Sequence, residues 1–204
     1  MILIWILAFV VAITVHEASH AWMADRLGDP TARLMGRLTL NPIVHYDPIG
    51  TTLLLVLVVM RYLDLPVIPF GWAKPVEFDP FNLKNPRRDS ALISFAGPAS
   101  NLTLALIISV IAHFSPLFSI FAKPFIILNV SLAIFNLIPI HPLDGGKILV
   151  GILPPKYAYD VDNFLHRFGT IILIFLILPS FGGSSFVSSI ISPVINIFLA
   201  LLIP

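Results

Sequence analysis

Long apolar segments alternate with short polar ones along most of the chain. A helix needs about 20 mostly apolar residues to cross a bilayer. Three segments meet this length, at residues 2–24, 90–114 and 117–140. A fourth apolar stretch, residues 168–203, is interrupted by Pro179 and by the sequence FGGSSF, and it predicts two short or tilted helices joined by a turn.

Two further segments have a different pattern. Residues 49–63 carry only about a dozen apolar residues before Arg61, a length typical of a re-entrant or interfacial segment. Residues 64–89 are rich in proline and polar side chains, which excludes a long helix and predicts extended strands or loop at the membrane surface. We therefore expect an all-α polytopic membrane protein with five to six membrane segments. One of them would be re-entrant, and a short extended, β-like stretch would lie at residues 64–89.

The composition agrees with a membrane location. The chain has 204 residues, of which 57% are hydrophobic and 11% are charged, and a soluble domain of this size could not bury so much apolar surface. The formal net charge of +1 gives no excess of basic side chains for a nucleic-acid partner. We expect one membrane-embedded domain over residues 1–204, with a catalytic core at about 1–153 and helical segments at 154–204.

The distribution of Lys and Arg predicts the orientation of the chain. If residues 49–63 re-enter, nearly all basic loops lie on one face and Lys123 is left near the other. The cytoplasmic bias of basic loops then places the N-terminus outside the cytoplasm, in a multi-pass protein of the cell membrane. If residues 49–63 span the bilayer, the basic loops are split between the faces. The first arrangement is favoured.

Three chemically reactive residues interrupt the first apolar segment. His16 and His20 are four residues apart, so on a helix they project from the same face and suit one zinc ion. Glu17 beside them can accept a proton from a metal-bound water, whose pKa zinc lowers toward ~7. The chain has no cysteine, so a third ligand must be His, Asp or Glu. Asp144 is the strongest candidate, because it follows the proline-broken cytoplasmic end of the span at 117–140.

Three blocks of sequence carry a family resemblance. HEASH at residues 16–20 is followed by AGPASN at 96–101 and NLIPIHPLDGG at 136–146, and in order and spacing these blocks resemble the site-2 protease family of intramembrane zinc metalloproteases. GRLTLNPIVHYDPIGT and PFGWAKPV resemble its compact prokaryotic branch. The resemblance covers roughly residues 5–150, and a chain of 204 residues leaves no room for the PDZ or CBS domains that regulate other members.

The resemblance implies a role for each residue of the site. His16, His20 and Asp144 would bind one zinc ion per chain. Glu17 would act as general base and acid, and Asn136 would contact the substrate or stabilise the oxyanion. The active site would face the cytoplasmic side.

We therefore expect a zinc-dependent metalloendopeptidase of the HExxH type. It would hydrolyse peptide bonds in or near transmembrane segments of membrane proteins, in regulated intramembrane proteolysis. Its partners would be that substrate and the lipid bilayer. The alternatives are a metal transporter and a catalytically inactive metal-binding membrane protein. The gathering of polar ligands at one end of the spans disfavours transport, and Glu17 disfavours an inactive protein.

Several of these residues also have a structural interpretation. Asp144 could be a turn residue in front of two glycines, and Asn136 could bond carbonyls exposed where proline interrupts the helix. Gly97 and Asn101 favour close helix packing, with Asn101 hydrogen-bonding across the contact. His141 either supports Asp144 or is an interfacial histidine.

Overall fold

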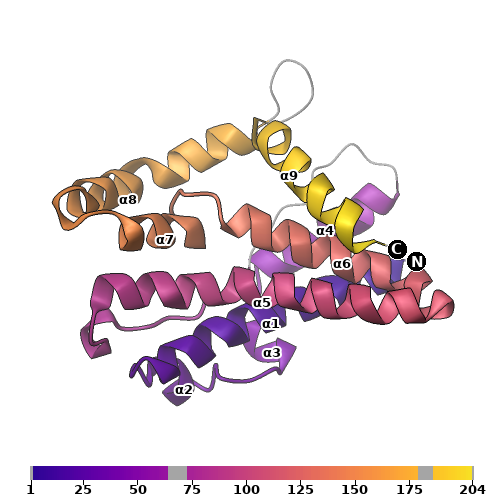
Figure 1. Cartoon of the computed structure of the whole chain (residues 1–204), viewed down its shortest axis with the longest axis horizontal. Coiled ribbons are helices and arrows are strands. Elements are labelled where there is room, and N and C mark those ends of the chain that lie inside the picture. Colours follow the sequence, from indigo (N-terminus) through magenta and orange to yellow (C-terminus); the bar gives the residue numbers. More distant parts are fainter. Residues whose placement is uncertain (1, 64–72, 179–185, 204) are drawn as a thin grey trace.

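The computed structural model describes residues 2–63, 73–178 and 186–203, and within these ranges it contains helices and loops but no β-strand (Figure 1). The α-helices are α1 (Ile2–Arg26), α2 (Thr31–Leu34), α3 (Pro42–His45), α4 (Gly50–Tyr62), α5 (Pro86–Phe114), α6 (Pro116–Asn136), α7 (Asp144–Ile152), α8 (Pro155–Ile177) and α9 (Phe186–Leu202).

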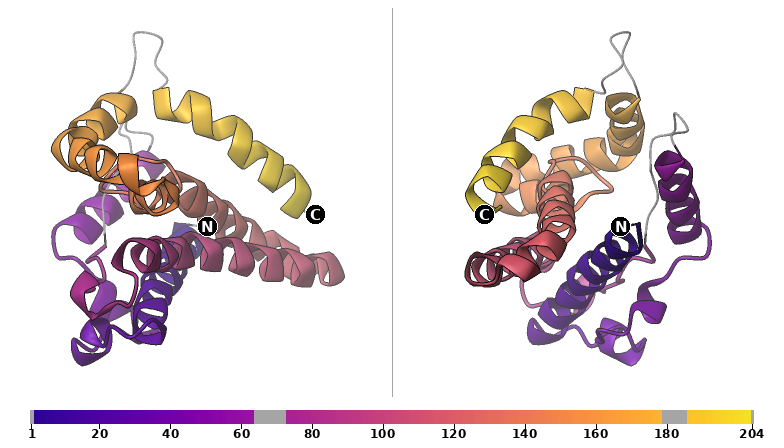
Figure 2. Two further views of the ribbon diagram at one scale, coloured as in Figure 1. Left: turned by 60° about the vertical axis from the view of Figure 1, so that its left-hand side comes forward. Right: turned by 90° about the vertical axis from the view of Figure 1, so that its right-hand side faces the viewer.

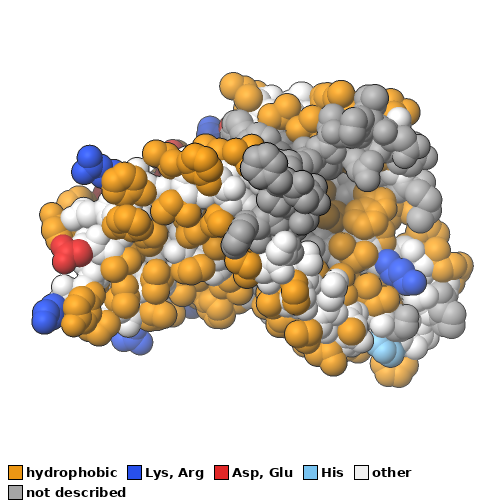
Figure 3. Space-filling view, turned by 90° about the horizontal axis from the view of Figure 1, so that it is seen from above, with side chains coloured by type: hydrophobic (Ala, Val, Ile, Leu, Met, Phe, Trp, Pro, Cys, Tyr) orange, Lys and Arg blue, Asp and Glu red, His pale blue; other side chains and the backbone are white. Residues whose placement is uncertain are grey.

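Three helices are long and apolar enough to cross a membrane: α1, α5 and the part of α6 from Leu117 to Asn136. They confirm the three spans expected from the sequence, although α6 ends at Asn136 and not at residue 140, in front of the proline-containing turn. Only 28%, 44% and 33% of their most apolar windows are buried inside the protein. The face shown in Figure 3 is covered largely by apolar side chains, with charged groups toward its two ends. Lipid is the solvent that suits such a surface.

α1 packs against α5 through a stripe of small side chains. Ala8, Ala12 and Ala24 are buried at intervals of a multiple of four residues, so they lie along a stripe that winds slowly around the helix. His16 and His20 continue the same interval and are also buried. Small residues allow two membrane helices to approach closely, so the packing face of α1 carries both histidines directly onto α5.

α5 lies at the centre of the molecule, against α1, α6 and α7 (Figures 1 and 2). Its contact with α6 is built from interlocking small and branched side chains, including Ala105 and Ile108 on α5 and Ile126 and Val130 on α6. α1 and α5 run antiparallel, so the end of α1 and the start of α5 lie at the same end of the molecule. The turn between α6 and α7 then brings the start of α7 back over the middle of α5.

The chain before α4 and the chain after it are hydrogen-bonded to each other. The Lys74 N–H donates to the His45 carbonyl at 3.0 Å. The Asp29 carboxylate accepts from the Asp79 N–H and from the Asn82 amide, both at 2.8 Å. The segments that precede and follow α4 therefore lie next to each other.

The stretch predicted to be extended differs from expectation at its C-terminal end. Residues 64–72 lie outside the described part of the chain, and 73–79 form a loop without strand pairing. A single 3-10 turn follows at Pro80–Asn82, and α5 begins at Pro86, so the expectation for 86–89 was wrong. Proline is favoured in the first turn of a helix, where no N–H is needed. Asp89 stabilises the same turn by accepting the Asn85 N–H at 2.8 Å.

The two helices expected in the last apolar stretch correspond to α8 and α9. α8 begins at Pro155, well before the apolar stretch at 168. The first half of this helix is amphipathic, so its polar residues hid it from a search for long apolar segments. The expected turn at Gly182 and Gly183 lies outside the described residues. The number of membrane segments and the re-entry of α4 remain predictions.

Candidate metal centre

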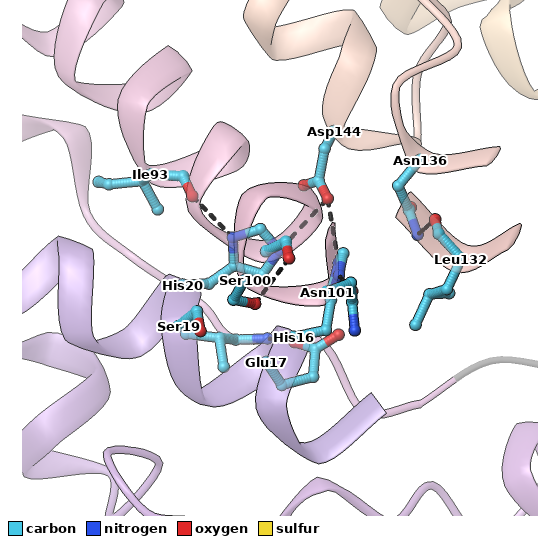
Figure 4. A network of polar contacts seen from close by, with 12 residues as sticks. His16, Glu17, Ser19, His20, Ile93, Ser100, Asn101, Leu132, Asn136 and Asp144 are labelled. Atoms are coloured by element: carbon cyan, nitrogen blue, oxygen red, sulfur yellow. Dashed lines mark hydrogen bonds and ion pairs between the residues drawn. The ribbon is translucent and has the colours of Figure 1, made fainter. Parts of the chain in front are cut away.

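His16, His20 and Asp144 meet where α1 faces the start of α7 (Figure 4). Asp144 Oδ2 lies 3.1 Å from His16 Nε2 and 3.3 Å from His20 Nε2. One potential ligand atom from each residue lies within 4.8 Å of the other two. Both histidines are buried and Asp144 is nearly so. Residues far apart in the sequence thus converge on one point.

The backbone around Asp144 requires glycine. Asp144 is the first residue of α7, and Gly145 and Gly146 follow it inside the helix. A Cβ atom on Gly145 would lie 2.2 Å from the Ile138 carbonyl oxygen, closer than any real contact. The turn after α6 can therefore fold onto the start of α7 only without a side chain at this position, which is what presents Asp144 to α1.

Both histidine rings are oriented by hydrogen bonds on their far nitrogen. His16 Nδ1 lies 2.6 Å from Asn101 Oδ1, and His20 Nδ1 lies 2.7 Å from the Ile93 carbonyl oxygen. These oxygens accept hydrogen bonds, so each Nδ1 carries the proton. Each Nε2 is therefore the ring nitrogen that points toward Asp144, and it is the atom that would bind a metal ion in place of a proton.

Asn101 is itself held in place. Its amide nitrogen donates to Asn129 Oδ1 on α6 at 2.7 Å and to the Ala12 carbonyl on α1 at 2.9 Å. Both asparagines are fully buried. The network joins the three candidate spans and fixes which end of the Asn101 amide faces His16. A buried network that is fully satisfied makes the geometry rigid.

Gly97 leaves room for both rings. A Cβ atom at this position of α5 would lie 2.5 Å from His20 Nε2 and 2.7 Å from the nearest carbon of His16. Gly97 therefore forms the part of the α5 surface that both imidazoles contact. The packing role expected for Gly97 and Asn101 is present, but both residues also touch the histidines.

The electrostatics favour an ionised Asp144. Burial alone would raise the pKa of its carboxyl, but the charge of His20 and hydrogen bonds from His16 and His20 hold that pKa well below its usual range. Lys147, one turn further along α7, has a pKa lowered by burial and raised in part by the charges of Asp144 and Glu17. The three charged groups thus face one another at the site.

Glu17 and Asn136 are placed differently from the three clustered residues. Glu17 Oε2 accepts the backbone N–H of Val76 at 3.0 Å, so the loop at 73–79 lies against its carboxylate. Asn136, the last residue of α6, uses its amide nitrogen to bond the Leu132 carbonyl in the same helix at 3.0 Å. This bond matches the structural alternative considered for Asn136.

The donor set suits zinc. A tetrahedral zinc ion with bonds of about 2.0–2.2 Å keeps its ligand atoms roughly 3.3–3.5 Å apart, and the two spacings to Asp144 of 3.1 and 3.3 Å are close to this value. Two imidazoles and one carboxylate leave a fourth position for water or substrate, as catalytic zinc sites require.

Sequence reasoning did not identify the residues that orient the histidines. Asn101 was assigned to packing, and the contacts from the Ile93 carbonyl and the Val76 N–H come from the backbone, where no residue type signals them. The block AGPASN could have indicated this role. Its glycine and asparagine are separated by about one helical turn, so they lie on the same face of α5, and in the structure this face meets α1.

The chain matches the sequence model described as peptidase family M50, over residues 4–125 and 113–176. It belongs to peptidase family M50. It is 36% identical over 190 residues to YwhC of Bacillus subtilis, covering 87% of this chain and 81% of that protein. The name of YwhC includes the term zinc metalloprotease.

More distant relatives are longer proteins. The chain is 28% identical over 152 residues to stage IV sporulation protein FB of Bacillus subtilis, covering 74% of this M50 chain and 52% of that protein. It is 24% identical over 162 residues to the zinc metalloprotease MJ0392 of Methanocaldococcus jannaschii, covering 76% of this chain and 37% of that one. No solved structure gives a significant match.

Proposed function

We propose that this M50 protein is an intramembrane zinc metalloprotease of the HExxH type, which hydrolyses peptide bonds in or near transmembrane segments of other membrane proteins. The observation that carries the proposal is the convergence of His16, His20 and Asp144 within 4.8 Å, on helices apolar enough for a bilayer and with Glu17 next to the first ligand. Family membership and the names of the relatives support the reaction class.

The three clustered residues hold the ion, and the rest of the site moves protons and binds the substrate. When bound, zinc would polarise the scissile carbonyl and make water reactive near neutral pH. Glu17 takes a proton from the attacking water and returns it to the leaving amine. The Val76 N–H fixes Oε2 of this carboxylate at 3.0 Å, which leaves Oε1 for proton transfer.

Asn136 is the proposed donor to the developing oxyanion. Because its amide nitrogen now bonds the Leu132 carbonyl, this role requires that bond to be exchanged for one to the substrate. Asn136 ends α6, beside the turn that leads to Asp144, so the exchange would have to come from a change of its rotamer. Its contribution is therefore expected to be smaller than that of Glu17.

The site would open to the cytoplasmic side of the cell membrane, with the N-terminus of α1 on the opposite side. The hydrogen bonds from Lys74 to His45 and from Asn82 to Asp29 support re-entry of the segment that contains α4, because they return the chain to the face it left. This arrangement keeps the basic loops at residues 26–37 and 84–88 together, in agreement with the positive-inside rule.

Metal removal tests the proposal. The purified protein, reconstituted in liposomes with a transmembrane substrate, should lose cleavage when 1,10-phenanthroline strips its zinc, and should regain it when stoichiometric Zn²⁺ is returned. The loss follows because the remaining residues supply a base but no Lewis acid. Cleavage that continues after zinc has fallen below detection would exclude a metalloprotease.

A further inference from the structure

A second group of metal-ligating side chains lies outside the centre described above. His141, in the loop between α6 and α7, faces Asp162 and His166 on α8. Asp162 Oδ1 lies 3.1 Å from His141 Nε2 and 3.2 Å from His166 Nδ1. Potential ligand atoms of the three residues all lie within 4.8 Å of one another.

The spacing of this group repeats that of the first centre. In both, one carboxylate oxygen stands between two imidazole nitrogens, at 3.1 and 3.3 Å in the first and at 3.1 and 3.2 Å in the second. Bonds of about 2.0–2.2 Å to a tetrahedral ion require roughly this separation. Two imidazoles and a carboxylate are ligands suited to zinc and to neighbouring divalent transition metals.

The ligand positions are fixed by packing. Asp162 and His166 are four residues apart on α8, so they share a face. His141 is buried between two glycines: a Cβ atom on Gly146 would lie 2.6 Å from its Nδ1, and one on Gly169 would lie 2.5 Å from its carbonyl oxygen. The close approach of α7 and α8 thus sets the position of His141 relative to the pair on α8.

The group has space for further ligands. All three residues line a pocket of about 780 Å³, in which a bound ion can complete its shell with water. The exposed fraction of the side chain rises from 8% for His141 to 41% for Asp162 and 66% for His166. An exposed ion pair alone contributes little to stability. Stability therefore does not explain why two imidazoles converge on one carboxylate oxygen.

We propose that His141, Asp162 and His166 bind a second divalent ion of the zinc type. Binding through His166 Nδ1 replaces the hydrogen bond of 2.9 Å that this nitrogen makes to the Asp162 carbonyl. Because the second site is more exposed and must give up this hydrogen bond, we expect it to bind the ion with lower affinity than the first site. Because His141 precedes Asp144 by three residues, an ion here ties α8 to the loop that presents a ligand of the first centre.

Zinc titration of the full-length, tag-free protein in detergent tests the proposal. Metal-free protein competing with a chromophoric chelator should bind two equivalents of Zn²⁺ in two affinity classes. His20→Ala should remove the tighter class and keep the weaker one. His166→Ala and Asp162→Asn should each weaken the second class at least roughly tenfold, since even loss of an outer partner of a metal site costs about 10–100-fold.

Asp160→Asn is the matched control, because Asp160 lies on the same helix, is exposed and is outside the group; it should leave both classes unchanged. His166 is largely exposed, so its variant should fold, and the retained tight class verifies this in the same titration. A single equivalent in the wild type, or a second class that His166→Ala does not weaken, would overturn the proposal. Neither outcome depends on cleavage, so the proposed protease activity is tested separately.

Discussion

Asn101 orients His16 through one hydrogen bond of 2.6 Å. We expect this interaction to support metal binding, because it keeps a ring proton on Nδ1 and so leaves Nε2 as the nitrogen that can bind the ion. Asn101→Ala should therefore weaken zinc binding by about 10–100-fold, the usual effect of removing an outer partner of a metal ligand. Competition with a chromophoric chelator measures the change.

The control for Asn101 is Asn101→Asp, which keeps the acceptor oxygen beside His16 and should recover part of the affinity. If Asn101→Ala binds zinc as tightly as the wild type, then the ring of His16 is oriented by packing alone and the network has no role in the site.

Asp29 is a buried carboxylate outside the spans. It accepts hydrogen bonds from the Thr31 hydroxyl at 2.6 Å and from the Asn82 amide and the Asp79 N–H at 2.8 Å. Burial would raise its pKa, but these bonds, led by the Thr31 hydroxyl, lower it overall. The carboxylate therefore stabilises the fold above the unfolded-state pKa of about 3.9, and this stability is lost as pH falls through the lower folded-state pKa.

Asp29→Asn should lower stability at pH 7 by about 1–3 kcal/mol, since one donor loses its acceptor. Its apparent Tm in detergent should also fall less steeply than that of the wild type between about pH 5 and pH 3, because the titrating group is gone. If the apparent Tm of the two proteins fell equally steeply with pH, other carboxylates would control stability in acid.

At the scale of single helices, the sequence singled out His16 and His20 as candidate ligands but did not show the surface against which they pack. The interval between His16 and His20 predicts a shared face on any helix, whereas their contact with Gly97 depends on how closely α5 approaches α1. That distance is set by the alanines of both helices and cannot be derived from one helix alone. The predicted start of α5, at residue 90, was four residues too late. The first turn of the helix is polar and is stabilised by Pro86 and Asp89, so apolar character alone did not reveal it.

Gly97→Ala tests the fit between α1 and α5. The added methyl group would overlap both imidazoles, so we expect a loss of roughly 1–3 kcal/mol in stability and a marked loss of zinc. Leu106→Ala on the same helix is the control, because Leu106 is exposed at 53% and its truncation should leave zinc content unchanged. Full zinc occupancy in Gly97→Ala would mean that the helices can separate at no cost to the site.

At the scale of the whole molecule, hydropathy located the three spans because length and composition suffice for that. It could not show that the segments before and after α4 lie side by side, since this depends on hydrogen bonds between residues such as Asp29 and Asn82 that are distant in the sequence. The pairing of His141 with α8, and not with Asp144, was likewise hidden, because no local pattern links the loop to that helix.

Cysteine labelling tests the orientation of the chain. The protein has no native cysteine, so single substitutions at exposed positions report directly on sidedness. Leu34→Cys and Lys84→Cys should both react with a membrane-impermeant maleimide from the cytoplasmic face, and Phe114→Cys from the opposite face. Labelling of positions 34 and 84 from opposite faces would show that α4 crosses the bilayer without returning.

The most direct test of the central claim is a paired measurement of zinc content and transmembrane-substrate cleavage on Glu17→Gln. The three proposed ligands are untouched, so one equivalent of zinc should remain at the first centre. Cleavage should fall by at least about 100-fold, because the variant has lost its general base. Cleavage at the wild-type rate with zinc in place would contradict the account.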